Sequence, residues 1–166
     1  MPFSLLPKVI ARDVTKLTPQ YLHSQGIRLL MMDFDNTIVP YTTDVPTAEV
    51  RQWLEMMKAS DIKLCVVSNS KRERVKVFCA KYGIDCITHA KKPFSKGIRE
   101  CLARYDLGAS VCALVGDQIY TDTLGANGCG VFSILVKAID NHNFWLKARH
   151  VLELPFIFMA RKRKIS

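Results

Sequence analysis

Long apolar runs and paired metal-binding cysteines are missing from this chain of 166 residues, and acidic residues are few. No apolar run reaches the ~18 residues that a membrane-spanning helix needs. Two prolines interrupt the first eight residues, so we expect no signal peptide there. The six cysteines form no C-x-x-C pair and stand apart from the histidines, which argues against zinc and favours reduced thiols in the cytosol.

The balance of charge is strongly basic. The chain has 24 lysines and arginines against 15 acidic residues, a net charge of +9. Such a charge favours an anionic partner, which can be nucleic acid, an acidic membrane surface or a phosphorylated substrate. A solvated basic surface without any such partner is the alternative.

Patterns typical of strands and helices alternate along the chain. Apolar runs predict strands at 27–32, 62–67, 85–88, 111–116 and 131–136. Apolar residues at helical spacing predict helices at 46–60, 71–82, 94–105 and 120–126. This alternation favours right-handed crossovers and a parallel sheet covered on both faces. The predicted fold class is α/β, a three-layer Rossmann-like sandwich.

We expect one domain that spans residues 1–166, because 49% hydrophobic and 23% charged residues are ordinary values for a globular protein. Its core is predicted at 27–136, and its last part, 137–166, as a helix and a basic tail. Residues 1–26 are expected to form an arm without a strand. Within that arm, Thr18 and Pro19 predict the start of a short helix that Gly26 would end.

Two carboxylates follow the first predicted strand, in the run Asp33-Phe34-Asp35-Asn36-Thr37. Side chains two residues apart on a strand point the same way, so Asp33 and Asp35 would share one side of the chain. Two negative charges gathered at the end of a buried strand require a cation or a chemical role. We therefore interpret this turn as the reaction centre.

Polar residues also follow the other predicted strands. Ser68 and Asn69 come after the second, Lys92 after the third and Asp117 after the fourth. Each alone is explained by ordinary turn chemistry. Because ligands of parallel α/β folds bind beyond the carboxyl ends of the strands, the four sets together predict one site.

These motifs resemble those of the haloacid dehalogenase (HAD) superfamily over residues 27–136. The run Asp33–Thr37 resembles its D-x-D-x-[TV] motif, and Ser68 stands where the second motif has Ser or Thr. Lys92 resembles the lysine of the third motif. The run from Gly116 to Asp122, GDQIYTD, resembles the acidic fourth motif. Within the superfamily the chain is similar to the type IIIA phosphatases of the YqeG family, which is itself related to the mitochondrial phosphatidylglycerophosphate phosphatases.

The resemblance and the chemistry of phosphoryl transfer imply the same roles. Asp33 is the candidate nucleophile that forms an aspartyl-phosphate, and Asp35 the candidate general acid and base. Mg²⁺ prefers hard oxygen ligands. The implied Mg²⁺ ligands are Asp33, the main-chain carbonyl of Asp35, and Asp117. The implied phosphate-binding residues are Ser68, Asn69 and Lys92. Asp122 is a supporting carboxylate that would orient Lys92 or a metal-bound water.

The spacing of the motifs leaves no room for a cap domain, since 38–61 and 70–92 are filled by predicted core elements. An open site suits a phosphoprotein, a nucleic acid or a lipid headgroup at a membrane. The apolar segment 152–160 followed by the basic residues 161–164 has the two signals of binding to anionic lipid. In the alternative interpretation, the apolar side chains pack on the core and the basic tail is frayed. Pro155 is expected to prevent a long helix here.

The leading hypothesis is a Mg²⁺-dependent phosphomonoester hydrolase in the cytoplasm, peripheral on the inner face of the membrane, with phosphatidylglycerophosphate as the candidate substrate. A phosphatase of phosphoproteins or nucleic-acid ends is one alternative. A basic RNA- or ribosome-binding protein with a vestigial site is another, although no RNA-recognition signature is present and no DNA partner is expected. Arg72 and Arg74, close to Ser68 in sequence, could line the cleft, but we expect them to be solvated surface residues.

Overall fold

The computed structural model describes residues 4–70, 73–140, 144–160 and 163–165. Within these residues, six parallel strands form one sheet in the order β1-β6-β5-β2-β3-β4. The strands are β1 (Val9–Ala11), β2 (Leu29–Met32), β3 (Lys63–Val67), β4 (Asp85–Ile87), β5 (Cys112–Gly116) and β6 (Phe132–Val136). The predicted α/β class and parallel sheet are confirmed.

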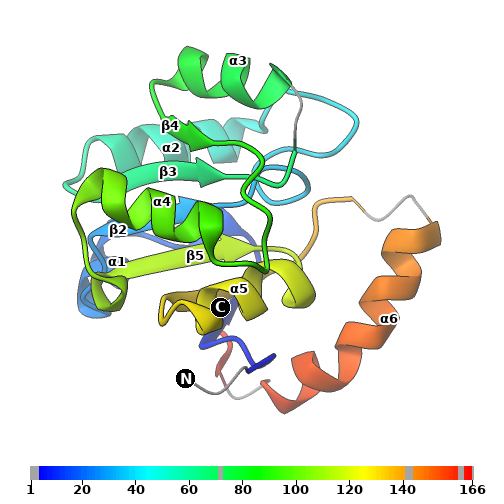
Figure 1. The fold of residues 1–166 in the computed structure, drawn as a ribbon. Helices are drawn as coiled ribbons and strands as arrows, with labels where there is room; N and C mark the ends of the chain where they lie inside the picture. Colours follow the sequence, from blue (N-terminus) through cyan, green and yellow to red (C-terminus); the bar gives the residue numbers. More distant parts are fainter. Residues whose placement is uncertain (1–3, 71–72, 141–143, 161–162, 166) are drawn as a thin grey trace.

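Helices cover both faces of the sheet and complete the three layers (Figure 1). They are α1 (Pro19–Ser24), α2 (Ala48–Lys58), α3 (Glu73–Tyr82), α4 (Lys96–Tyr105) and α5 (Leu124–Gly128). The last helix, α6 (Phe144–Met159), stands to the side of these layers, beyond the carboxyl ends of the strands. Alternate residues of β2 enter opposite cores because strand side chains alternate between faces. Met32 packs with residues of α1, α2 and α3, and Met31 packs with residues of α4 and α5.

The helix starts follow from local capping. The Thr18 hydroxyl accepts a hydrogen bond from the Tyr21 N–H (3.1 Å), with Pro19 at the first helical position. The Thr47 hydroxyl accepts one from the Val50 N–H at the start of α2 (3.3 Å). Such caps satisfy amide groups that have no partner inside the helix. The short helix predicted in the arm is thereby confirmed.

The expectation of an amino-terminal arm without a strand was wrong. Val9–Ala11 forms β1, an edge strand that pairs with β6 and places Val9 opposite Ile134. Beyond β1, the carboxyl-terminal segment adds a single bridge between Ile10 and Lys164. Three residues are too short to show a two-residue alternation, so only the partner strand decides that this segment is extended.

The expectation that Pro155 prevents a long helix was also wrong, since α6 runs from Phe144 to Met159 with Pro155 inside it. A proline removes one hydrogen bond, here to the carbonyl of Val151. Val151 is 61% exposed, so the missing hydrogen bond lies on the solvent side of the helix. Among the described residues, no helix is long and apolar enough to cross a membrane.

Candidate active site

The polar residues predicted from the strand ends meet at the carboxyl edge of the sheet. Asp33 directly follows β2, and its N–H donates to the carbonyl of Val115 in β5 (2.9 Å). The chain moves from β2 outward to β3 and β4, then returns to the other side of β2 as β5. Ligands bind at such a reversal of strand order, and Asp33 and Asp117 follow the two strands that border it.

The turn after β2 depends on Asn36. Asn36 adopts a left-handed conformation with φ of 61°, which asparagine tolerates better than most residues. Its N–H donates to the Val39 carbonyl (2.7 Å), and its side-chain amide donates to the Asp140 carbonyl (2.7 Å). The turn that carries Asp35 is therefore tied to the loop after β6.

Lys92 is the buried cation of the site. Its Nζ donates to Asp33 Oδ1 at 2.6 Å and to Asp122 Oδ1 at 2.7 Å, and the residue is only 4% exposed. Burial lowers the pKa of Lys92, but the carboxylates of Asp122 and Asp33 outweigh it and hold that pKa above its ordinary value. The ammonium is therefore charged at physiological pH.

Both oxygens of Asp122 are engaged. Oδ1 accepts from Lys92, and Oδ2 accepts from the N–H of Gln118 (3.1 Å). Burial raises the pKa of Asp122 to about 6, although the Lys92 charge opposes that shift. This arrangement favours the predicted supporting role, in which Asp122 orients Lys92.

Gly116, the last residue of β5, makes room for Asp122. A Cβ at position 116 would collide with the Asp122 carboxyl, which cannot retreat without losing Lys92 or the Gln118 N–H. We expect Gly116→Ala to lower kcat by about 100-fold through a displaced Lys92, with correct folding seen by circular dichroism. Gly108→Ala is the matched control, because its Cβ would meet only the Ser110 hydroxyl at 3.9 Å. Equal activity of the two variants would contradict this reasoning.

Three carboxylates gather where a divalent cation can bind. Asp33, Asp117 and Asp122 each offer an oxygen, and these oxygens lie within 4.8 Å of one another. The Thr37 hydroxyl donates to Asp117 Oδ1 at 3.5 Å. Three negative charges against the one ammonium of Lys92, all on hard oxygen ligands, fit a divalent metal. The cluster contains both predicted side-chain ligands, Asp33 and Asp117, together with Asp122. The main-chain carbonyl of Asp35 stays a predicted ligand.

Ser68 and Asn69 lie beside Lys92. Ser68 is buried, and its hydroxyl accepts from the Ser70 N–H (3.0 Å). The Asn69 side chain both accepts from the Lys92 N–H (2.7 Å) and donates to the Lys92 carbonyl (2.9 Å). The Asn69 side chain therefore positions the segment that carries Lys92, and the predicted contact of Asn69 with phosphate stays a prediction.

Arg74 is not the solvated surface residue we expected but contacts the active-site turn, and Arg72 lies outside the described residues. Its Nη2 lies 3.4 Å from Asp35 Oδ1 and its Nε 2.6 Å from Asp44 Oδ1, and the side chain is 13% exposed. Its guanidinium stacks over Phe34, 5.1 Å from the ring centroid. It also donates to three carbonyls of the turn, those of Pro40, Tyr41 and Thr43. No local pattern predicts this role, because every partner lies at least 30 residues earlier in the chain.

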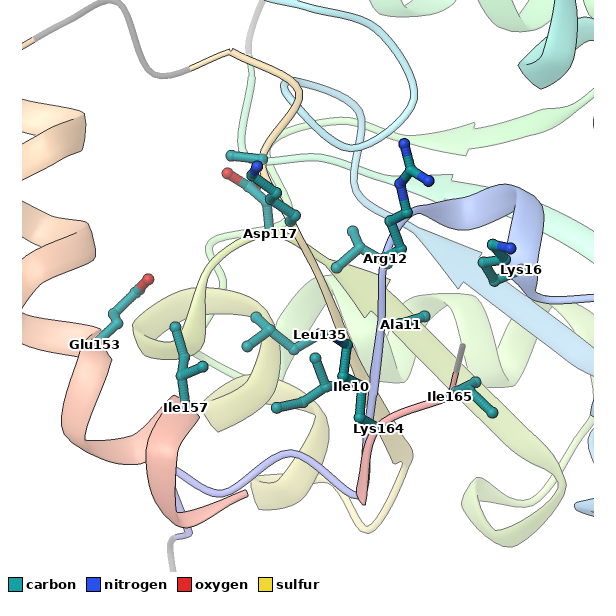
Figure 2. Close-up of a pocket in the computed structure, with 13 residues that line it drawn as sticks. Ile10, Ala11, Arg12, Lys16, Asp117, Leu135, Glu153, Ile157, Lys164 and Ile165 are labelled. Carbon is teal, nitrogen blue, oxygen red and sulfur yellow. The ribbon is translucent and has the colours of Figure 1, made fainter. Parts of the chain in front are cut away.

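A pocket of about 530 Å³ adjoins the carboxylate cluster and shares Asp117 with it. Figure 2 shows it between α6, which contributes Glu153 and Ile157, and the β1 edge of the sheet. Its apolar lining includes Ile10, Leu135, Ile157 and Ile165. Its basic lining consists of Arg12, Lys16, Lys137 and Lys164. Glu153 is buried and accepts from the Ile119 N–H (2.9 Å). Because Glu153 and Asp117 are the acidic residues of the lining and four residues are basic, positive charge is in excess around the pocket.

Comparison with known proteins agrees with this geometry. The family model described as mitochondrial PGP phosphatase matches residues 1–139. A protein named probable phosphatase YqeG, from Bacillus subtilis, is 34% identical over 159 residues, covering 96% of this chain and 92% of that protein. The Arabidopsis thaliana phosphatidylglycerophosphate phosphatase 1 is 24% identical over 95% of this chain, which spans 48% of its length.

Solved structures share the fold. A cobalt-bound deoxy-D-mannose-octulosonate 8-phosphate phosphatase from Haemophilus influenzae aligns with a TM-score of 0.55 at 14% identity, over 84% of this chain and 92% of that one. A HAD subfamily IIIA hydrolase from Legionella pneumophila aligns with a TM-score of 0.54 at 14% identity, over 77% of this chain and 73% of that one. With the matched family model and the motifs at the strand ends, they show that this chain is a HAD-type phosphatase and belongs to the mitochondrial PGP phosphatase family.

Proposed function

We propose that this protein is a Mg²⁺-dependent phosphomonoester hydrolase that works through an aspartyl-phosphate and acts on phosphatidylglycerophosphate. The observation that carries the proposal is the contact of Lys92 with Asp33 and Asp122 beside the Asp117 carboxylate. A carboxylate nucleophile, a fixed cation and a divalent-metal site are the parts that phosphoryl transfer needs.

The chemistry divides into two displacements at phosphorus. In the first, an oxygen of Asp33 forms a bond to phosphorus while the bond to the alcohol oxygen breaks, and Asp35 gives that oxygen its proton. In the second, Asp35 takes a proton from water, whose oxygen attacks phosphorus and releases Asp33 and inorganic phosphate. Arg74, 3.4 Å from Asp35, holds that carboxyl and the turn around it.

Lys92 and a bound metal would both neutralise negative charge of the carboxylates and the phosphate. Lys92 places a fixed positive charge against Asp33, which lowers the repulsion between this anion and an approaching phosphate. Asp33 and Asp117, with Asp122 beside them, would hold Mg²⁺, which when bound stabilises negative charge on the phosphoryl oxygens. The buried Ser68 hydroxyl and neighbouring amides would bind those oxygens.

The pocket beside Asp117 supports the choice of substrate. Phosphatidylglycerophosphate carries a terminal phosphomonoester, a second phosphate in a diester, and two acyl chains. The basic side chains of Arg12, Lys16 and Lys137 match the second phosphate, and the apolar side chains of Ile10 and Leu135 match the glycerol and the start of the chains. The name of the Arabidopsis relative and the description of the family point to the same ester.

Phosphate release from two substrates tests the proposal. We expect EDTA to abolish turnover and Mg²⁺ to restore it, because the carboxylate cluster would otherwise repel the phosphate. We expect kcat/KM for phosphatidylglycerophosphate in detergent micelles to exceed that for p-nitrophenyl phosphate by at least about tenfold, since remote contacts lower the barrier. Turnover of the soluble ester without any release from the lipid would reject the substrate, and full activity in EDTA would reject the metal.

A further inference from the structure

The outward side of the last part of α6, from 151 to 159, is apolar among the side chains that the structure describes. Val151, Leu152, Leu154, Phe158 and Met159 are between 47% and 69% exposed. At 3.6 residues per turn these positions fall on one side of the helix, and the buried Glu153 and Ala160 fall on the other. We call these five exposed side chains the outer face of α6.

No charge interrupts this outer face. Glu153 is the one charged residue of 151–160, and it is turned inward, where it accepts from the Ile119 N–H. A helix at a solvated surface normally carries charged residues on its outward side. A contiguous exposed apolar surface of this kind marks a site of interaction.

The outer face lies on the same side of the molecule as the catalytic edge. Figure 1 shows α6 along the side to which the strands point with their carboxyl ends. Among the described residues, eleven large hydrophobic side chains are exposed, five of them on the outer face. Four others follow the carboxyl ends of strands, namely Tyr41, Val45, Phe94 and Ile139. Nine of these eleven side chains therefore lie on α6 or in segments that leave the carboxyl edge of the sheet, where the active site is.

Basic residues lie behind this surface, between α6 and the β1 edge of the sheet. Arg12, Lys137 and Lys164 are exposed and line the adjoining pocket, and Arg163, also exposed, donates to the Pro7 carbonyl (2.9 Å). Arg161 and Lys162, the other members of the predicted basic tail, lie outside the described residues. The excess of positive charge, +9 for the chain, would repel a second copy and attract an anionic surface.

We propose that the outer face of α6 docks on an anionic phospholipid bilayer, with the exposed basic residues of the adjoining pocket, Arg12 and Lys137, facing the headgroups. Apolar side chains in the headgroup region together with basic residues near them supply the two contributions that interfacial binding needs. A helix docked in this way turns the carboxyl edge of the sheet, with Asp33 and Asp117, towards the lipid headgroups. The proposal goes beyond the assigned hydrolysis, because it concerns binding and requires no turnover.

Cosedimentation with vesicles tests the docking surface. Wild type is expected to bind vesicles that contain phosphatidylcholine and phosphatidylglycerol. It should bind little to vesicles of pure phosphatidylcholine. The double variant Leu152→Asp/Met159→Asp removes apolar contact and adds charge to the outer face, so we expect its affinity to fall by at least about tenfold. Met56→Asp/Val77→Asp is the matched control, because it changes charge equally at exposed apolar positions on α2 and α3. Its affinity should change by less than about threefold.

Two further measurements keep folding and hydrolysis separate from docking. Turnover of p-nitrophenyl phosphate by the Leu152→Asp/Met159→Asp variant should equal that of wild type, which also shows that it folds. If it unfolds, Leu152→Ala/Met159→Ala should give a smaller loss of binding in the same direction. The proposal is overturned if wild type ignores anionic vesicles, or if the control loses as much affinity. A stable dimer in light scattering that only the α6 variant dissociates would assign the face to a second copy instead.

Discussion

Asp33→Asn is expected to reduce kcat by roughly 10⁴-fold or more, as the loss of a covalent nucleophile does. An amide cannot form the acyl-phosphate, although asparagine nearly matches the shape of aspartate. Its carbonyl oxygen can still accept the hydrogen bond that Lys92 now donates to Asp33 Oδ1 at 2.6 Å. Phosphate release over hours, with wild type in parallel, measures the effect.

The same substitution should leave the fold intact. It removes one of three carboxylates that lie within 4.8 Å of one another, so it relieves repulsion. We expect the free energy of unfolding in EDTA to be unchanged or higher by up to about 2 kcal/mol. Asp106→Asn is the matched control, since Asp106 is an exposed helix cap with φ of 51°, a conformation that asparagine adopts readily. If Asp33→Asn retained substantial activity, another group would have to be the nucleophile.

Lys92→Met is expected to cost stability as well as activity. Lys92 is buried between Asp33 and Asp122, so its removal leaves two buried carboxylates without their cation. Removing one partner of a buried ion pair typically costs about 3–5 kcal/mol. Urea denaturation in EDTA measures the loss, because a bound metal ion would otherwise neutralise the same carboxylates.

A double variant separates charge from packing at this position. Lys92→Met/Asp122→Asn removes the negative charge at position 122 along with the cation of Lys92. The amide oxygen of the new asparagine can still accept from the Gln118 N–H. We expect it to regain at least about 1 kcal/mol relative to Lys92→Met while remaining inactive. If both variants lost the same stability, the loss would come from packing around the lysine stem, and the ion pair would not be its cause.

The two variants address different parts of the site. Asp33 is expected to act on the substrate directly, whereas Lys92 is expected to contact the phosphate and also donates to Asp33. Asp122 and Asn69 in turn hold Lys92, one through its ammonium and the other through its main chain. Loss of activity therefore has several possible causes in this network, and the stability measurements tell them apart.

Most of the cysteines are core residues, as predicted. All six are free, and Cys65, Cys79, Cys101 and Cys112 are buried. Burial raises the pKa of Cys112 to about 11 and holds that of Cys79 well above its ordinary value. Thiols in this state are poor nucleophiles. We therefore do not expect these buried thiols to act as nucleophiles in place of Asp33.

The sequence by itself determined the central strands and the residues at their ends. Apolar runs such as the one before Asp33 are long enough to identify buried strands without knowledge of their partners. Parallel strands bring their carboxyl ends to one edge, so Asp33, Ser68, Lys92 and Asp117 were predicted to meet there. Each of these inferences needs only local pattern and the handedness of the crossovers.

The tertiary structure decided the features whose cause lies far away in the chain. β1 is extended because its backbone pairs with that of β6. α6 continues through Pro155, although the local rule for proline predicts a break in the helix. Arg74 reaches Asp35 from α3, which no spacing in the sequence indicates. Local patterns indicate which side chains of a segment are buried and which face water. The pairing of β1, the course of α6 and the contact of Arg74 depend instead on which segments the fold has brought together.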